Sequence, residues 1–251
     1  MEQGTTMGDS RVALVTGANK GIGRAIAEAL SDCGVRVFVG SRDPSRGEQA
    51  LSEMEAPGRR LELVEIDVTS PDSVAAAVRQ IAELAGRLDI LVNNAGIACE
   101  PPSSLPSTLT AEVIRMTYET NVLGVVTVTN ACLPLLRESP AGRIVNCSSE
   151  TGSKSIWSDP HNPMSMYAPL VPAYSSSKAA LNSLTVAYAK ELKDTPIKVN
   201  AVSPGHIGTD LNGGAGPGTP AEGAAVVVPF ALLDDNGPTG GFFGTHGPVP
   251  W

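Results

Sequence analysis

Short apolar runs alternate with segments of helical periodicity along most of the chain, and this alternation restricts the possible folds more than any other feature. Residues 11–16, 35–40 and 142–147 are short runs rich in β-branched side chains, which is typical of buried strands. Residues 21–33 and 70–86 instead carry apolar side chains three and four positions apart, as one face of a helix does. The pattern predicts an α/β fold of the doubly wound type, with a parallel sheet of about seven strands and helices on both faces.

The same pattern indicates one domain. We expect residues 1–10 to form a flexible N-terminal tail and residues 11–251 to form a single domain. Residues 110–136 are predicted to form one long helix that bends near Gly124. Residues 151–171 contain three prolines and are predicted to form a long loop without regular structure.

The charge balance argues against some classes of partner. The chain of 251 residues has 18 Lys and Arg against 26 Asp and Glu, so its net charge of −8 is unlike that of proteins that bind nucleic acid or anionic membranes. We expect no membrane-spanning helix, because no apolar run reaches about 18 residues, and no signal peptide, because the first ten residues are polar. Four cysteines without a CxxC spacing predict free thiols and a cytoplasmic protein, and three dispersed histidines predict no metal site.

A glycine-rich turn joins the first predicted strand to the first predicted helix. It reads Thr-Gly-Ala-Asn-Lys-Gly-Ile-Gly at residues 16–23. The glycines allow a tight turn and a close approach of a pyrophosphate, and the helix N-terminus offers free N–H groups and a favourable dipole. The turn therefore predicts a Rossmann-type dinucleotide site formed by Gly17, Asn19, Lys20, Gly21, Ile22 and Gly23.

The end of the second predicted strand indicates which dinucleotide binds. An NAD site usually has Asp or Glu there, to accept a hydrogen bond from the ribose 2′-hydroxyl, whereas this strand ends in Gly-Ser-Arg at residues 40–42. Arg42 can pair with a 2′-phosphate through two hydrogen bonds, and Lys20 adds a second positive charge. We therefore expect NADP(H) as the cofactor. The alternatives are that both cations are only solvated, or that Asp43 turns toward the ribose.

Polar residues follow two more predicted strands at the same edge of the sheet. A carboxylate at Asp67 and the N–H of Val68 can flank an adenine, and residues 94–96 place an amide and small residues beside the cofactor. The asparagines at 93–94 can instead satisfy backbone groups of neighbouring strands, and both roles can hold together. The candidate cofactor residues in these segments are Asp67, Val68, Asn94, Ala95 and Gly96.

A tyrosine and a lysine lie one helical turn apart on the helix predicted at residues 172–192. Tyr174 and Lys178 therefore share one face, and the positive charge is expected to lower the pKa of the phenol and make it a candidate general acid/base. The alternative is an exposed pair without a function. Ser149 follows the fifth predicted strand, at the edge where ligands bind in such sheets. Asn121 lies in an otherwise apolar helix, so its amide needs a partner, such as a water molecule.

Together these residues resemble the classical short-chain dehydrogenase/reductases. The resemblance covers about residues 11–250, and the motifs occur in the order typical of that family. They are T-G-x-x-x-G-x-G at 16–23, N-N-A-G at 93–96, N-V at 121–122, V-N-C-S-S at 145–149, Y-x-x-x-K at 174–178 and S-P-G-x-x-x-T-D at 203–210. Within the family, the sequences T-G-A-N-K-G-I-G and S-R-D are similar to those of NADPH-dependent carbonyl reductases.

The resemblance implies a role for each matching residue. Ser149 is implied to hydrogen-bond the substrate carbonyl, and Tyr174 to donate the proton. Lys178 is implied to bind the nicotinamide ribose and to lower the pKa of Tyr174, so that both helix residues also touch the cofactor. Asn121 is implied to hold a water that links Lys178 to solvent. The segment implied to wrap the nicotinamide contains Pro204, Gly205, Ile207 and Thr209.

One spacing departs from the family pattern. Ser149 and Tyr174 are 25 residues apart, about twice the usual separation, so we expect an insertion at about residues 154–170. Such an insertion can cover the helix face through which relatives pair, and both a monomer and a homo-oligomer stay open. The candidate substrate residues are Glu150, Trp157 and Tyr167. For the two aromatic residues, the alternative is that they pack the insertion onto its own domain.

The segment at residues 211–218 is the expected second wall of the substrate entrance. It consists mostly of glycine, asparagine and proline, so few apolar groups compensate for the entropy lost on ordering it. We expect a short, mobile lid and an open entrance that accepts bulky substrates, followed by a helix at about residues 219–230.

These observations predict an enzyme that reduces a ketone or an aldehyde to an alcohol with NADPH, and a small-molecule carbonyl compound as its partner. One alternative is an NAD(P)-dependent alcohol dehydrogenase that works in the oxidative direction. Another, from a different class, is a dinucleotide-binding protein without catalytic activity.

Overall fold

A computed structural model of the chain describes residues 10–101, 104–163, 165 and 171–251. Across these residues one sheet has eight strands in the order β3-β2-β1-β4-β5-β6-β7-β8. Their bounds are β1 (Val12–Val15), β2 (Arg36–Ser41), β3 (Arg60–Glu65), β4 (Ile90–Asn93), β5 (Arg143–Cys147), β6 (Lys198–Val202), β7 (Phe242–Gly244) and β8 (Gly247–Pro248). Neighbours from β3 to β7 pair in parallel, and β8 pairs antiparallel with β7. The predicted parallel, doubly wound sheet is confirmed, and the two-residue β8 is an addition to it.

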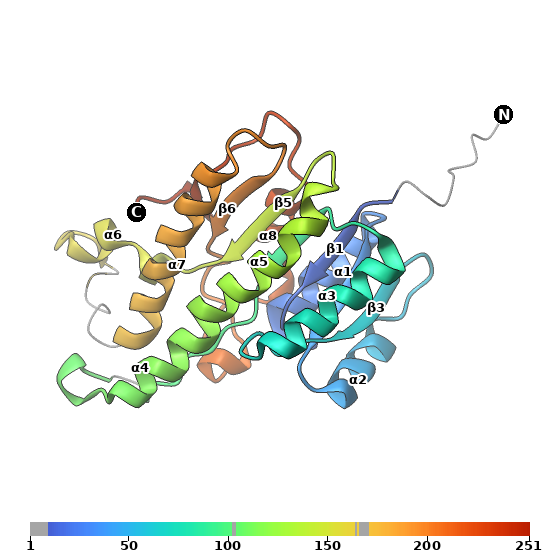
Figure 1. Ribbon diagram of the computed structural model, residues 1–251. Coiled ribbons are helices and arrows are strands. Elements are labelled where there is room, and N and C mark those ends of the chain that lie inside the picture. The colour runs from blue at the N-terminus through green and yellow to red at the C-terminus, as the bar shows by residue number, and fades with distance from the viewer. Residues whose placement is uncertain (1–9, 102–103, 164, 166–170) are drawn as a thin grey trace.

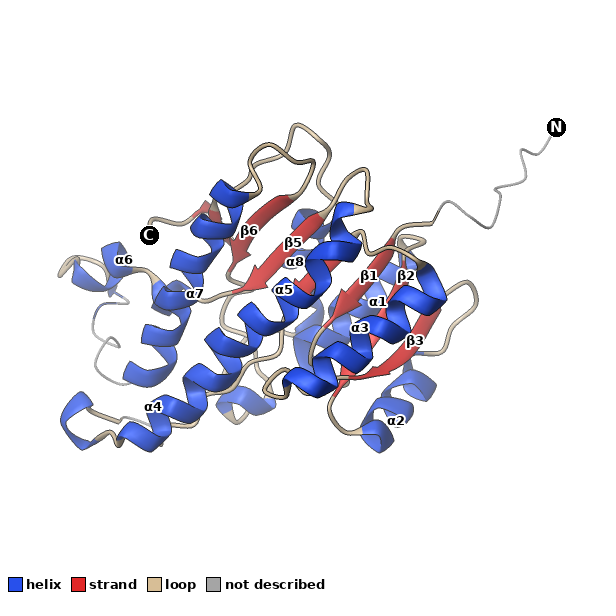
Figure 2. Cartoon of the chain, viewed as in Figure 1, coloured by secondary structure: helices blue, strands red, loops and turns tan. Residues whose placement is uncertain are grey.

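Helices cover both faces of this sheet, as Figure 1 shows. Their bounds are α1 (Gly21–Asp32), α2 (Pro44–Met54), α3 (Pro71–Ala85), α4 (Ala111–Tyr118), α5 (Gly124–Arg137), α6 (Lys154–Ser158), α7 (Pro172–Glu191) and α8 (Pro220–Ala231). Helices α3, α5 and α7 pack on one face, and α1, α2 and α8 pack on the other. In Figure 2 the arrows of β1, β5 and β6 point toward the same edge, so their carboxyl ends meet there.

The strands separate two hydrophobic cores because successive side chains point to opposite faces. In β1, Leu14 belongs to the core under α3, α5 and α7, and Val15 belongs to the core under α1 and α8. Both side chains are fully buried. Each fully buried side chain of this size contributes about 1.5–3 kcal/mol to folding. This two-sided burial explains why the strand sequences are continuously apolar rather than alternating.

Helices α2 and α3 begin where the sequence provides a cap and a proline. Asp43 accepts a hydrogen bond from Arg46 N at 3.1 Å at the start of α2, and Ser70 accepts one from Ser73 N at 3.4 Å at the start of α3. Each cap is followed by a proline, whose fixed φ suits the first helical position and which lacks an N–H to satisfy.

The long helix predicted at 110–136 is divided by a π-helical turn. Helix α4 passes into this turn at Glu119–Leu123, and α5 begins at Gly124. A Cβ on Gly124 would lie 2.9 Å from Val68 Cγ2, so the glycine lets the helix approach the segment after β3 closely. The stretch Ala111–Arg137 is long and apolar enough to cross a membrane by length and composition, but half of its most apolar window is buried inside this fold.

The prediction of a long loop at residues 151–171 is wrong for the first part of this segment. A 3-10 turn at Glu150–Gly152 leads directly into the five-residue helix α6. The Ser153 side chain caps this helix by accepting a hydrogen bond from Ile156 N at 3.1 Å, and the prolines come only after its end. The short segment before the prolines was therefore free to become helical.

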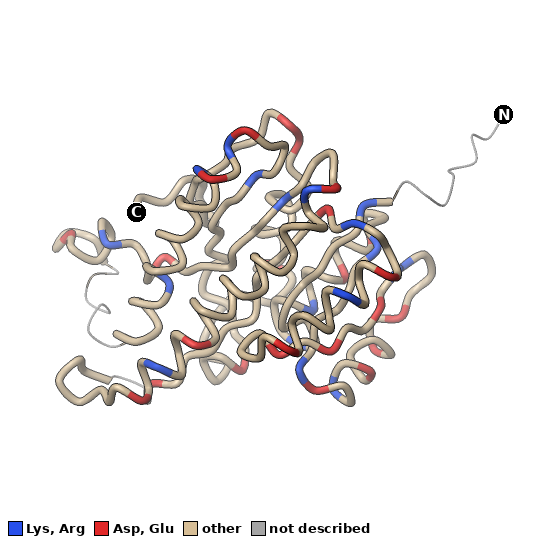
Figure 3. Tube along the Cα trace, in the orientation of Figure 1, with Lys and Arg blue, Asp and Glu red and all other residues tan. Residues whose placement is uncertain are grey.

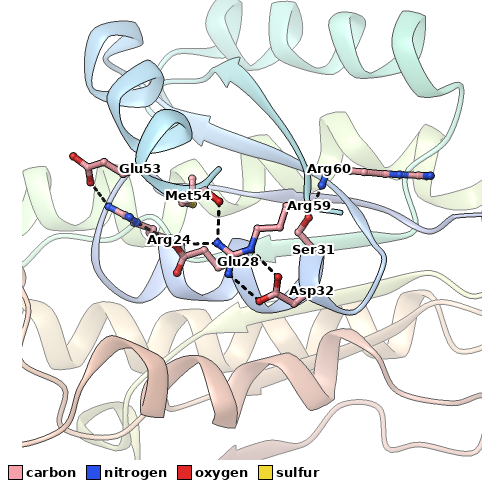
Figure 4. A network of polar contacts seen from close by, with 8 residues as sticks. All are labelled: Arg24, Glu28, Ser31, Asp32, Glu53, Met54, Arg59 and Arg60. Carbon is pink, nitrogen blue, oxygen red and sulfur yellow. Dashed lines mark hydrogen bonds and ion pairs between the residues drawn. The ribbon is translucent and has the colours of Figure 1, made fainter. Parts of the chain in front are cut away.

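Positions of Lys and Arg and of Asp and Glu are interspersed along the trace in Figure 3. Figure 4 shows one ion-pair network that joins α1 to the segment before β3. In it, Arg59 donates to Asp32 at 2.7 Å, and Arg24 pairs with both Glu28 and Glu53. These pairs are exposed or partly exposed, so water screens them and they contribute little to stability. All four cysteines are free, and the cytoplasmic location stays a prediction.

Candidate active site

The glycine-rich turn closes over the end of β1 with almost no free space. Gly17 has a φ of +63°, and a Cβ there would lie 3.0 Å from Ala95 Cα. A Cβ on Gly23 would lie 2.5 Å from Gly17 O. The Asn94 side chain braces the turn by donating to Thr16 O at 2.9 Å and to Gly17 O at 3.1 Å. The alternative reading of Asn94 as a brace for the backbone is therefore confirmed.

The N-terminus of α1 is open toward an anion. Its cap residue Lys20 makes no side-chain cap hydrogen bond, and the first turn contains no acidic residue. The N–H groups of this turn and the positive end of the helix dipole suit a pyrophosphate. The tight turn and the uncapped helix together fit a dinucleotide, whose phosphates would be held by residues 17–23.

Arg42 lies just after the end of β2, and its side chain is exposed. Burial acts to raise the pKa of Asp67, but the hydrogen bonds from Thr69, with a smaller effect of the Arg42 charge, hold this pKa below its usual value. Asp43 does not turn toward the sheet edge, because it caps α2 and lies 3.4 Å from Arg46 Nε. Lys20, the second predicted cation, is paired with Asp210 at 2.7 Å.

The residues predicted around the nicotinamide lie next to the glycine-rich turn. Thr209 is 3.5 Å from where a Cβ on Gly21 would lie. Ile207 is buried and forms an isolated parallel bridge with Gly218. A 3-10 turn at Asp210–Asn212 begins the connection between Thr209 and α8, and this connection is short, as expected. Its mobility stays a prediction.

Asn121 sits in the π-helical turn, which is a common place for functional residues. Its Nδ2 donates to Ile97 O at 2.8 Å and to Ser177 Oγ at 3.0 Å, and its Oδ1 accepts from Ile97 N at 2.9 Å. The buried amide is thus satisfied by Ile97 and by α7. A Cβ on Gly96 would contact both Asn121 Oδ1 at 3.4 Å and Lys178 Nζ at 3.5 Å, so the three residues lie together.

Lys178 and Tyr174 lie on the same face of α7, as their spacing predicts. Lys178 is 4% exposed, donates from Nζ to Cys147 O at 2.8 Å, and lies 5.4 Å from the centroid of the Tyr174 ring. Burial lowers the pKa of Lys178 to about 8. Burial likewise raises the pKa of Tyr174 to about 12, despite a hydrogen bond with Ser149. The expected lowering of the Tyr174 pKa is absent, because burial raises this pKa and the charge of Glu100 raises it further.

Ser149 completes the group at the end of β5. Besides the bond with Tyr174, its Oγ accepts from Thr151 Oγ1 at 2.9 Å and from Thr151 N at 3.2 Å. The structure therefore brings Asn121, Ser149, Tyr174 and Lys178 to one site from three elements that are distant in sequence. Such a site can hold a carbonyl oxygen between two hydroxyl groups and protonate it.

The candidate substrate residues are placed differently. The Glu150 carboxylate faces the last strands, since a Cβ on Gly244 would lie 2.6 Å from its Oε1. Trp157 lies on α6, and its buried indole N–H has no hydrogen-bond partner among the residues that the structure describes. Tyr167 lies outside the described residues, so its assignment stays a prediction.

Two features near the site were missed in the sequence. Glu100 is buried and accepts a hydrogen bond from Tyr174 N at 2.9 Å. The chain end holds α6, since Ser155 N donates to Trp251 O at 2.8 Å and Ser153 Oγ to Pro250 O at 2.6 Å. An acidic residue soon after the N-N-A-G motif was a signal for Glu100, whereas no local pattern indicates the second contact. The described residues contain no group of three or more potential metal ligands.

Comparison with known proteins agrees with this geometry. The sequence model of the short chain dehydrogenase family matches residues 11–218. The chain is 35% identical to (-)-isopiperitenone reductase of Mentha piperita, over 93% of this chain and 96% of the relative. It is 31% identical to carbonyl reductase (NADPH) 1 of Rattus norvegicus, over 97% and 99%. The structure of salutaridine reductase from Papaver somniferum is similar with a TM-score of 0.78 and 30% identity, over 94% and 99% of the two chains.

Proposed function

We propose, from the premise that this chain belongs to the short-chain dehydrogenase family, that it is an NADPH-dependent reductase of small ketones or aldehydes. The family and its reductase relatives make it an oxidoreductase that acts on small molecules. The observation that carries the finer proposal is the joint placement of Asn121, Ser149, Tyr174 and Lys178 beside an open helix N-terminus. A protein that only binds a dinucleotide needs no such group.

The two hydroxyl groups act on the substrate oxygen. Ser149 Oγ orients the carbonyl by a hydrogen bond. Tyr174 donates the proton that converts the carbonyl oxygen into the hydroxyl group of the alcohol. The phenol is available as an acid because its pKa of about 12 keeps it protonated at neutral pH. The bound nicotinamide supplies the hydride for the carbonyl carbon, and the residues described here supply orientation and charge.

Lys178 and Asn121 support this proton transfer without contacting the substrate oxygen. Lys178 Nζ donates to Cys147 O. In this proposal its ammonium binds the ribose hydroxyls and replenishes the proton on Tyr174. Asn121 fixes Ile97 and Ser177 and so keeps the segment after β4 against α7. Its role as the holder of a water molecule stays a prediction.

The preference for NADPH rests on charge. Arg42 is exposed at the end of β2, without a carboxylate partner within hydrogen-bond distance among the described residues, and is free to bind a 2′-phosphate. Asp43, the residue that could have favoured NADH, is engaged at the start of α2. The relative named carbonyl reductase (NADPH) 1 supports the same choice.

The test is a carbonyl panel with each cofactor. Purified protein is mixed with NADPH or NADH and a series of aromatic and aliphatic ketones and aldehydes, and the loss of absorbance of the reduced cofactor is followed. We expect turnover with NADPH and much less with NADH. Turnover of alcohols with NAD⁺, but none of carbonyls with NADPH, would instead support an alcohol dehydrogenase. Cofactor binding without turnover of any substrate would support the non-catalytic alternative.

A further inference from the structure

A buried carboxylate beside the proton donor has no part in the mechanism above. Glu100 lies between Gly96 and the 3-10 turn at Pro106–Thr108, and only 9% of it is exposed. Transfer of a charged group from water into the protein is costly unless hydrogen bonds replace its lost hydration. Each oxygen of this carboxylate is therefore expected to have a partner.

The first oxygen has a partner that explains part of this burial. Helix α7 begins at Pro172, which has no N–H, and its cap residue Val171 makes no side-chain cap hydrogen bond. Glu100 Oε1 takes the place of a cap by accepting from Tyr174 N at 2.9 Å. The carboxylate thus sits at the positive end of a 20-residue helix, where a negative charge is favourable.

The second oxygen of the Glu100 carboxylate has no hydrogen-bond partner among the described residues. This oxygen, Oε2, is buried. An ionised carboxylate can only accept hydrogen bonds, so the missing partner is a donor. The Glu100 carboxylate is held against Tyr174 by the bond from its backbone N–H. Its charge also contributes to the raised pKa of Tyr174, after the larger effect of burial. An unused acceptor therefore lies next to the residue whose hydroxyl must meet the substrate oxygen.

We propose that Glu100 Oε2 accepts a hydrogen bond from the substrate, so that the enzyme prefers carbonyl compounds that carry a hydroxyl or a protonated amine near the carbonyl group. This specificity role rests on the proposed function, since it concerns the substrate of that reaction. A site with a buried acceptor discriminates strongly against an analogue that lacks the donor, because binding then leaves the acceptor unpaired.

The experiment compares matched ketones with the wild-type protein and NADPH. The probes are acetophenone and three derivatives that carry a substituent on the carbon next to the carbonyl: 2-hydroxyacetophenone, 2-methoxyacetophenone and 2-aminoacetophenone. The amine is protonated and tests for a cationic substrate. The methoxy compound retains the electron withdrawal of the neighbouring oxygen, adds one methyl group and has no donor, and acetophenone without a substituent controls for size. We expect kcat/KM for the hydroxy compound to exceed that of the methoxy compound about 10-fold or more, as for a hydrogen bond to a charged group. A higher value for the amine than for the hydroxyl would identify a cationic substrate.

The variant Glu100→Gln tests which residue causes the preference. The amide oxygen can keep the bond from Tyr174 N, and the amide NH₂ then replaces the free acceptor by a donor. We expect the ratio of hydroxy to methoxy kcat/KM to fall by about 10-fold, to near or below one. The ratio cancels any common effect on Tyr174 or on folding. Glu112→Gln, which removes an exposed carboxylate paired with Arg115, is the matched control and should keep the wild-type ratio.

The outcomes separate this inference from the proposed function. If no carbonyl compound oxidises NADPH, the proposed function fails and the inference with it. If the wild type reduces the hydroxy and methoxy ketones equally well, reductase activity stands and the role of Glu100 is wrong. A preference that survives in Glu100→Gln would also overturn it. Should Glu100→Gln not fold, Glu100→Asp, which shortens the reach of the carboxylate, should lower the same ratio.

Discussion

Lys20 Nζ lies 2.7 Å from Asp210 Oδ2, so an ion pair joins the glycine-rich turn to the residue after Thr209. Both side chains are largely exposed, at 57% and 76%. The pair occupies the cation that was expected to help bind a 2′-phosphate, and the Lys20 interaction lowers the pKa of Asp210. In the proposed complex, the 2′-phosphate of NADPH would therefore have to compete with Asp210 for Lys20.

Removal of that competitor should favour NADPH. In Asp210→Asn the Lys20 ammonium is free, and one negative charge near the phosphate is lost, so we expect the Kd for NADPH to fall about 2-fold or more at low ionic strength. NADH, which lacks the 2′-phosphate, should bind as before. Fluorescence titration of both cofactors measures this. Asp194→Asn, an exposed carboxylate beside Lys193, is the control. Equal changes for NADH and NADPH would show that Lys20 does not face the 2′-phosphate.

Reversal of charge at Arg42 should have the opposite effect. Arg42→Asp removes a charge-assisted pair and adds repulsion, so NADPH binding should weaken by about 2 kcal/mol, or about 30-fold. The affinity for NADH should change little or improve. Arg79→Asp, on the distant helix α3, makes the same change in net charge and serves as the control. The argument for NADPH fails if the wild type binds NADH as tightly as NADPH.

Loss of the Tyr174 hydroxyl should stop proton donation. Tyr174→Phe keeps the ring, and kcat should fall by about 10²–10⁴-fold, the usual contribution of a general acid. NADPH binding should change little. Tyr188→Phe is a matched control on the same helix, where the hydroxyl donates to Asn130 at 2.9 Å. Near-normal turnover by Tyr174→Phe would assign the proton donor to another group.

The pH profile should report Lys178 rather than Tyr174. Burial lowers the pKa of Lys178 to about 8, so the ammonium loses its charge as the pH rises through that value. Tyr174, with a pKa of about 12, stays protonated over the same range. We therefore expect kcat/KM to fall with rising pH from about 8. Lys178→Met should be slower and should lack this step. A step that persists unchanged in the variant would belong to another group.

Substrate size should follow from the short segment after Thr209. With only one 3-10 turn before α8, little chain closes over the substrate, so a bulky aromatic ketone should give a higher kcat/KM than acetone. Hydrogen exchange should be faster at residues 211–218 than in the buried strands if this segment is mobile. Strong protection of its amide groups, together with a preference for acetone, would contradict the open entrance.

Features that depend on residues close together along the chain could be predicted before the structure was known. Strand-to-helix alternation predicted the parallel sheet and its two helical layers, because side-chain periodicity is a local property. The glycine-rich turn followed from local backbone preferences. The spacing of Tyr174 and Lys178 placed both on one helix face for the same reason.

Contacts and charge effects between segments that are distant along the chain could not be predicted, because they form only when the chain folds. Lys20 meets Asp210 from 190 residues away, and Glu100 reaches Tyr174 N from 74 residues away. The π-helical turn around Asn121 forms where α4 and α5 lie against α7 and the segment after β4. The pKa of Tyr174 rises, where the helix spacing alone predicted a fall. Burial depends on everything that surrounds a group, and the residues that surround this phenol come together only when the sheet forms.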